Sequence, residues 1–189
     1  MSWSFAFIAI RAGKDVVLQR LGMEDTGRAV EPYRAAASCV ELPSGWTVVA
    51  SDKMDFASPE LLALLSQDGE ALGCWLSDVV MASDAFGYRD GREVWSIRYD
   101  CNEHDGVVDA AGKLPPQFKA IYKKARAAQA AEEDGPPVDY VWDVPADVVA
   151  AITGYRYDEF DEAAFTVLAP PRGPKADPFQ ALKRLFGKR

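Results

Sequence analysis

The sequence contains few of the residues that most often bind metals or act as nucleophiles. Among its 189 residues there is one histidine, His104, and there are three cysteines, Cys39, Cys74 and Cys101. The cysteines are widely spaced and odd in number, and no two of them form a CxxC pair. This usage is typical of reduced thiols in a cytoplasmic protein and differs from that of a secreted disulfide framework.

Long hydrophobic runs and nucleotide-binding loops are also missing from the sequence. No run approaches the roughly 20 apolar residues needed to cross a bilayer, and the first residues lack a cationic segment followed by an apolar one. There is no GxGxxG or GxxxxGKS/T loop, no GxSxG elbow, no HExxH pair and no kinase signature. We therefore expect a cytoplasmic protein that neither spans a membrane nor carries a cofactor.

What the sequence does contain is an uneven distribution of charge. The net charge is −8, from 21 basic and 29 acidic side chains. Residues 172–189 carry six basic groups and one acidic group, so residues 1–171 carry 15 basic and 28 acidic groups, a net charge of −13. An acidic body repels nucleic acid and anionic lipid, so we expect neither as a partner of residues 1–171.

Hydrophobic alternation and turn residues predict strands joined by short turns. Pro43-Ser44-Gly45 predicts one hairpin turn, because proline fixes φ and glycine tolerates positive φ. Asp90-Gly91 predicts a second, because a type I′ turn requires positive φ twice. Ser58 is expected to cap a helix whose first residue is Pro59. Residues 23–35 are expected to be irregular. We predict strands at 3–10, 38–42, 46–51, 71–76, 80–88, 93–99, 138–144 and 165–169, and helices at 15–21, 59–67, 116–133 and 146–153.

Strands that pair through short turns, without strand–helix–strand crossovers, favour an α+β fold. We predict an antiparallel sheet built from hairpins, with helices packed mainly on one face. We assign residues 1–169 to a single domain, because 49% apolar and 26% charged residues match globular averages. Residues 170–178, with four prolines and one glycine, are assigned to a linker, and residues 179–189 to a basic amphipathic helical tail.

The tail combines an apolar stripe at helical spacing with basic side chains. We predict that it contacts a partner through Phe179, Leu182, Lys183, Arg184, Leu185 and Phe186. A helix of about ten residues is not stable alone, so the tail is either disordered or docked. Docking on its own domain, binding in the groove of a protein partner, and contact with anionic lipid or nucleic acid stay open.

The single histidine lies in a polar segment that follows the predicted strand 93–99. Cys101 and His104 have the spacing of half a metal site, but zinc needs three or four protein ligands. Alternatively, Cys101 acts as a nucleophile with His104 as its base. The interpretation we favour is a polar loop that ends a strand, with Cys101 as a small filler. We therefore assign no metal site and no catalytic residue, and keep His104 with Cys101 as the alternative.

Acidic side chains offer a second candidate for catalysis. Asp139 and Asp143 flank a predicted strand, and residues 158–162 hold four more carboxylates. A carboxylate pair performs glycoside chemistry when one member is buried and its pKa is raised. Clusters of this kind are more often solvated surface, so the carboxylates stay an alternative.

The five tryptophans lie on or beside predicted strands, where large rings are mostly buried, although tryptophan is also favoured at binding hot spots. They are Trp3, Trp46, Trp75, Trp95 and Trp142. The sequence leaves open which of these rings face the surface.

Several short phrases of the sequence form a recognisable set. They are Trp3-Ser4-Phe5, Leu42-Pro43-Ser44-Gly45-Trp46, Val94-Trp95-Ser96-Ile97, Val138-Asp139-Tyr140 with Asp143-Val144-Pro145, and Ile152-Thr153-Gly154-Tyr155-Arg156. Together they resemble a family of small bacterial proteins without assigned activity, over about residues 1–160. The resemblance implies a bacterial cytoplasmic protein and brings no catalytic residues with it.

The missing motifs, the acidic body and the tail together predict a non-enzymatic, cytoplasmic protein-binding module, comparable by analogy to bacterial immunity or adaptor proteins. One alternative is an enzyme of unrecognised type, with a site near His104 and Cys101 or at a carboxylate pair. A second alternative is a tether in which the tail binds anionic lipid.

Overall fold

A computed structural model of the chain describes residues 3–102, 107–131, 138–159 and 164–171. Its strands are β1 (Ser4–Ile10), β2 (Glu24–Ala29), β3 (Ser38–Glu41), β4 (Thr47–Ser51), β5 (Glu70–Ser77), β6 (Ala82–Arg89), β7 (Arg92–Asp100), β8 (Asp109–Gly112) and β9 (Thr166–Ala169). Its helices are α1 (Lys14–Leu21), the 3-10 helix η1 (Met54–Ala57), α2 (Pro59–Leu65), α3 (Phe118–Ala131) and α4 (Val144–Thr153).

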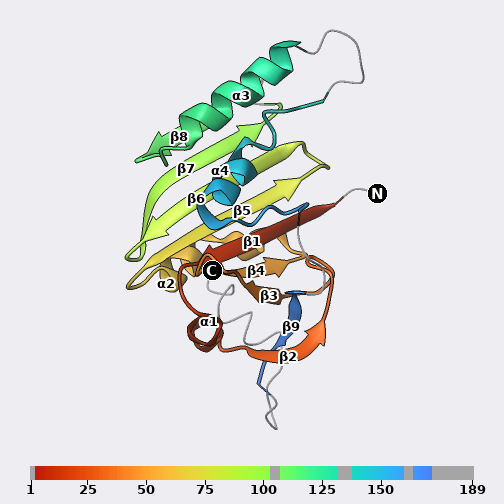
Figure 1. Ribbon diagram of the computed structural model, residues 1–189, viewed down its shortest axis with the longest axis vertical. Helices are drawn as coiled ribbons and strands as arrows, with labels where there is room; N and C mark the ends of the chain where they lie inside the picture. Colours follow the sequence, from red (N-terminus) through yellow and green to blue (C-terminus); the bar gives the residue numbers. More distant parts are fainter. Residues whose placement is uncertain (1–2, 103–106, 132–137, 160–163, 172–189) are drawn as a thin grey trace.

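The described strands form one nine-stranded sheet in the order β2-β9-β3-β4-β1-β5-β6-β7-β8, in which every neighbouring pair is antiparallel (Figure 1). The prediction of an α+β fold with an antiparallel sheet is therefore confirmed. The β6–β7 turn has the type I′ backbone, with φ of 50° at Asp90 and 77° at Gly91. Ser58 caps α2 as predicted, because its hydroxyl accepts a hydrogen bond from the Leu61 N–H at 3.3 Å.

Helices cover both faces of the sheet, so the prediction that they pack mainly on one face is wrong. Along β1, alternate side chains enter two separate cores. Phe5 and Phe7 lie in the core that holds buried residues of α3 and α4. Ile8 and Ile10 lie in the core that holds buried residues of α1, η1 and α2. We call these the first and second faces.

Three local predictions also differ from the structure. Residues 24–29, predicted to be irregular, form β2, and β8 was not predicted. Both are short edge strands whose side chains are mostly exposed, so neither shows the alternation that burial of one face produces. The predicted strand at 138–144 is wrong, because residues 140–143 form a turn that leads into α4.

The two ends of β1 mark two ends of the sheet. Trp3 precedes β1, and it lies at the end where the β5–β6 turn, the last residues of β7 and the chain entering α4 also lie (Figure 1). Arg11 follows β1 at the opposite end, where its side chain contacts Glu70, the first residue of β5. His104, the tail 179–189 and linker residues 172–178 lie outside the described residues. No helix in the described part of the chain is both long and apolar enough to cross a membrane.

Candidate functional site

Cys101 lies exposed just after β7, and its predicted partner His104 falls outside the described residues. The Cys101 sulfur is 3.9 Å from the carbonyl oxygen of Val80. The other two thiols, Cys39 in β3 and Cys74 in β5, are buried, and burial raises the pKa of both. The structure therefore does not bring the three cysteines together. Within the described ranges, no group of three His, Cys, Asp or Glu side chains is arranged to hold a metal ion.

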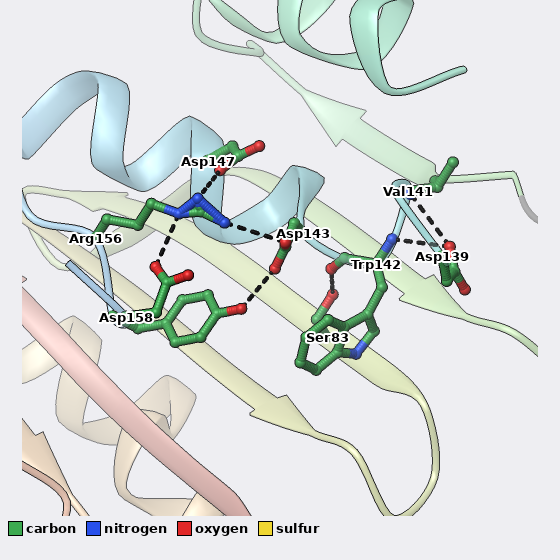
Figure 2. A network of polar contacts seen from close by, with 9 residues as sticks. Ser83, Asp139, Val141, Trp142, Asp143, Asp147, Arg156 and Asp158 are labelled. Atoms are coloured by element: carbon green, nitrogen blue, oxygen red, sulfur yellow. Dashed lines mark hydrogen bonds and ion pairs between the residues drawn. The ribbon is translucent and has the colours of Figure 1, made fainter. Parts of the chain in front are cut away.

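Two of the candidate carboxylates, Asp143 and Asp158, bind the guanidinium group of Arg156 (Figure 2). The contacts are 3.1 Å from Arg156 Nη2 to Asp143 Oδ2 and 2.9 Å from Arg156 Nε to Asp158 Oδ1. A third carboxylate, Asp147 of α4, lies 3.3 Å from Arg156 Nη1. Asp143 Oδ1 also accepts a hydrogen bond from the Tyr157 hydroxyl at 2.8 Å. Partial burial raises the pKa of Asp147, while the charge of Arg156 opposes this change.

Asp139 stabilises the turn that replaces the predicted strand. Its Oδ1 accepts hydrogen bonds from the backbone N–H groups of Val141 and Trp142 at 3.1 and 3.2 Å, and its Oδ2 accepts one from the Tyr99 hydroxyl at 2.5 Å. The Ser83 hydroxyl donates to the Trp142 carbonyl oxygen at 2.6 Å (Figure 2). These contacts fasten the chain entering α4 to β6 and β7.

The carboxylates of Asp139 and Asp143 are thus engaged in separate structural networks. Each carboxylate has donors within hydrogen-bond distance, and the two acids belong to different sets of contacts. The sequence alternative of a free carboxylate pair at these two positions gains no support from this arrangement, whose evident role is to hold α4 on the first face.

Exposed apolar side chains gather at the end of the sheet where β1 begins. Of nine large hydrophobic side chains that are exposed in the described residues, six lie there. They are Trp3, Val79, Val80, Val107, Val138 and Tyr140, and we call this surface the rim. Val79 has the largest exposed fraction, 65%, and the Trp3 ring is 40% exposed. A concentration of apolar side chains on a surface is typical of an interaction site.

Hydrogen bonds connect the segments that form the rim. The Trp3 N–H donates to Asp78 Oδ1 at 2.7 Å, and the Asp78 N–H donates to the Trp3 carbonyl at 3.2 Å. The Asn102 side-chain amide donates to the Val80 carbonyl at 3.5 Å. The Trp3 ring is 6.0 Å from the Trp142 ring, centroid to centroid. These contacts join residue 3, residues 78–80 and residues 138–142, which are three of the four parts of the sequence that supply the rim.

Three carboxylates lie in segments that form or border the rim. Segments 78–81, 100–102 and 138–142 include Asp78, Asp100 and Asp139 and contain no lysine or arginine, while Arg126 of the neighbouring helix α3 acts on Tyr99, which donates to Asp139. An apolar surface bordered by carboxylates is complementary to a segment that carries both apolar and basic side chains.

The tryptophans divide between core and surface. Trp3 lies on the rim, whereas Trp46 and Trp95 are only 4% and 7% exposed. Both buried rings nevertheless line a pocket at the opposite end of the sheet, which also includes Arg11, Glu70 and Arg89. Sequence reasoning missed this pocket because its residues are far apart in the chain, although the tryptophans themselves were identified as candidates for either role.

Comparisons of the chain with protein-family models, with curated proteins and with solved structures found no match.

Proposed function

We propose that this protein is a binding module that captures a basic, amphipathic segment of a partner protein on the rim. The observation that carries the proposal is the gathering, at one end of the sheet, of six of the nine large apolar side chains that are exposed in the described residues, with Asp78, Asp100 and Asp139 in the same segments. A partner segment with apolar and basic side chains would bury the former and pair the latter with carboxylates.

The rim has the features expected of a preformed binding surface. Trp3 supplies a large ring whose position is fixed by stacking on Phe5, with 4.8 Å between the centroids and 10° between the planes. Tryptophan contributes strongly to many protein interfaces, and a fixed ring loses little conformational entropy on binding. Val79 and Val80 lie in the turn beside it, where the hydrogen bonds between Trp3 and Asp78 hold the backbone.

The three thiols are free cysteines, and two of them are buried. Free thiols persist in a reducing compartment, so a cytoplasmic location is part of the same proposal. The two alternatives drawn from the sequence, an enzyme of unrecognised type and a tail that binds anionic lipid, stay predictions, and His104 and the tail lie outside the described residues.

A labelled synthetic peptide tests the proposal. The probe has the sequence of residues 174–189, because this segment is basic and amphipathic. It is titrated into the full chain carrying Leu182→Glu and Leu185→Glu, so that the protein's own tail does not compete. Fluorescence anisotropy is expected to show saturable binding that weakens as salt increases.

Two variants of that full chain locate the binding surface. Val79→Ser with Val80→Ser shortens two exposed rim side chains and is expected to weaken binding by roughly tenfold. Val16→Ser with Leu64→Ser removes comparable exposed side chains from α1 and α2, and is expected to leave the affinity unchanged. The proposal fails if the probe does not bind, or if the two double variants weaken binding equally.

A further inference from the structure

A pocket of about 320 Å³ opens at the end of the sheet opposite the rim. Arg11, directly after β1, forms one side of it, and β5, β6 and β7 form its base. Residues 113–117, which join β8 to α3, and Ile152 of α4 complete the wall. The volume is at the lower end of the range for small-molecule sites, so the pocket fits a compact organic ligand.

Three largely buried apolar side chains line the pocket. They are those of Trp46, Leu72 and Trp95, and each is at most 7% exposed. The Trp95 ring lies directly on Gly87, since a Cβ atom built on Gly87 would be 2.0 Å from the indole nitrogen. Gly87 therefore lets the ring lie against the strand, and a planar apolar group is the natural complement of this surface.

Three cations line the pocket. Arg11 and Arg89 both bind the carboxylate of Glu70, and the Arg11 contact measures 3.2 Å. Hydrogen bonds from Arg89 and Arg11 lower the pKa of Glu70, which keeps the carboxylate charged at neutral pH. With Lys113, the lining residues carry three positive charges and one negative charge, although residues 1–171 as a whole carry −13.

The two arginines have donors left for a ligand. Each guanidinium group has five N–H donors, and a single nitrogen of each contacts Glu70. The side chains of Arg11 and Arg89 are 63% and 60% exposed, so the remaining donors are accessible from solvent. Arg11 is also held over the Trp46 ring, with its Cζ atom 5.9 Å from the ring centroid. An incoming carboxylate therefore meets prepositioned donors.

Gln117 adds an unused acceptor to the wall. Its Oε1 atom is buried and has no hydrogen-bond partner among the described residues. Buried carbonyl oxygens in native structures are almost always paired, because an unpaired one loses its bond to water without replacement. Gln117 lines the pocket, and a rotation of its side-chain amide toward the pocket would let Oε1 accept a hydrogen bond from a hydroxyl or N–H group of a bound ligand.

We propose that this pocket binds a small aromatic carboxylate that carries a hydroxyl or N–H donor. The aromatic ring packs on Trp46 and Trp95, the carboxylate binds the cations that line the pocket, and the donor binds Gln117. This site is independent of the rim, because the two surfaces share no residue and lie at opposite ends of β1. A negative binding result at one surface therefore does not contradict the proposal for the other surface.

Titration of the full chain with three small molecules, followed by NMR, tests the class of ligand. The probes are 4-hydroxyphenylacetate, phenylacetate, which lacks the hydroxyl, and tyramine, which carries an ammonium group in place of the carboxylate. We expect affinity to fall in that order, with the signals of the Trp46 and Trp95 indole N–H groups shifting as the first probe binds. Absence of saturable shifts with 4-hydroxyphenylacetate, or equal affinity for tyramine, overturns the proposal.

Three variants test the assigned roles. Arg11→Gln with Lys113→Gln is expected to weaken 4-hydroxyphenylacetate binding by roughly tenfold, because two charged donors are lost. Arg98→Gln removes an arginine that lies over Phe86 on the second face and is expected to leave binding unchanged. Gln117→Leu is expected to abolish the preference for 4-hydroxyphenylacetate over phenylacetate. A preference that survives Gln117→Leu shows that the hydroxyl binds elsewhere, which contradicts the proposed orientation.

Discussion

The indole ring of Trp95 in β7 occupies the space where residue 87 of β6 would carry its side chain. The two residues are register partners, and a Cβ atom on Gly87 would lie 2.0 Å from Trp95 Nε1. We expect Gly87→Ala to destabilise the protein by about 1–3 kcal/mol, because the ring must leave its position in the first-face core. Urea denaturation measures this loss.

Gly69→Ala is the matched control for that substitution. A Cβ atom on Gly69 would meet no heavy atom within 4 Å, and the glycine does not have positive φ. The free energy of unfolding of the Gly69→Ala variant should stay within about 0.5 kcal/mol of that of the natural chain. Equal effects of the two alanine substitutions would contradict the steric explanation.

Arg156 contacts three carboxylates, those of Asp143, Asp147 and Asp158. Arg156→Met is expected to lower the free energy of unfolding by about 1–2 kcal/mol at pH 7, since three partly exposed carboxylates are left facing one another. The loss should be smaller at pH 4, because the raised pKa of Asp147 favours protonation of that carboxylate as pH falls. Arg34→Met breaks an exposed pair with Glu31 and should change little at either pH.

Asp84 of β6 makes stability depend on pH. Burial raises its pKa to about 6, against the attraction of Arg98, its register partner in β7. Between the ordinary pKa of an aspartate and about 6, the folded state binds more protons than the unfolded state, so stability falls as pH rises through this window. Asp84→Asn should therefore raise the free energy of unfolding at pH 7 by about 1–2 kcal/mol.

The measurement for Asp84 is chemical denaturation at pH 4 and pH 7. The stabilisation by Asp84→Asn should be present at pH 7 and nearly gone at pH 4, where the carboxyl group is protonated in the folded state. An equal effect at both pH values would assign the change to packing and would contradict the electrostatic explanation.

The tail is predicted to compete for the rim. Its apolar stripe and basic side chains have the chemistry proposed for the partner segment. The labelled peptide of residues 174–189 should therefore bind the natural chain more weakly than the variant with Leu182→Glu and Leu185→Glu, as measured by anisotropy. Equal affinities would show that the tail does not occupy the rim.

The sequence by itself determined the local elements whose causes are local. Asp90 and Gly91 set the β6–β7 turn because their positive φ angles fit a type I′ hairpin, and Ser58 with Pro59 set the start of α2. Alternating or nearly continuous apolar residues identified β1 and β5, because strands at the centre of a sheet are buried on both faces. Antiparallel pairing followed from the short connections.

Only the tertiary structure decided the edges, the faces and the candidate sites. β2 and β8 lack a local signal because neither buries a full face, and the alternation at 138–144 comes from a turn held by Asp139. The pocket unites Arg11, Trp46 and Gln117. The rim likewise unites residues as far apart as Trp3 and Tyr140. The strand order and the register of the sheet bring these distant residues together. Both depend on packing across the whole sheet, and no short stretch of sequence encodes that packing.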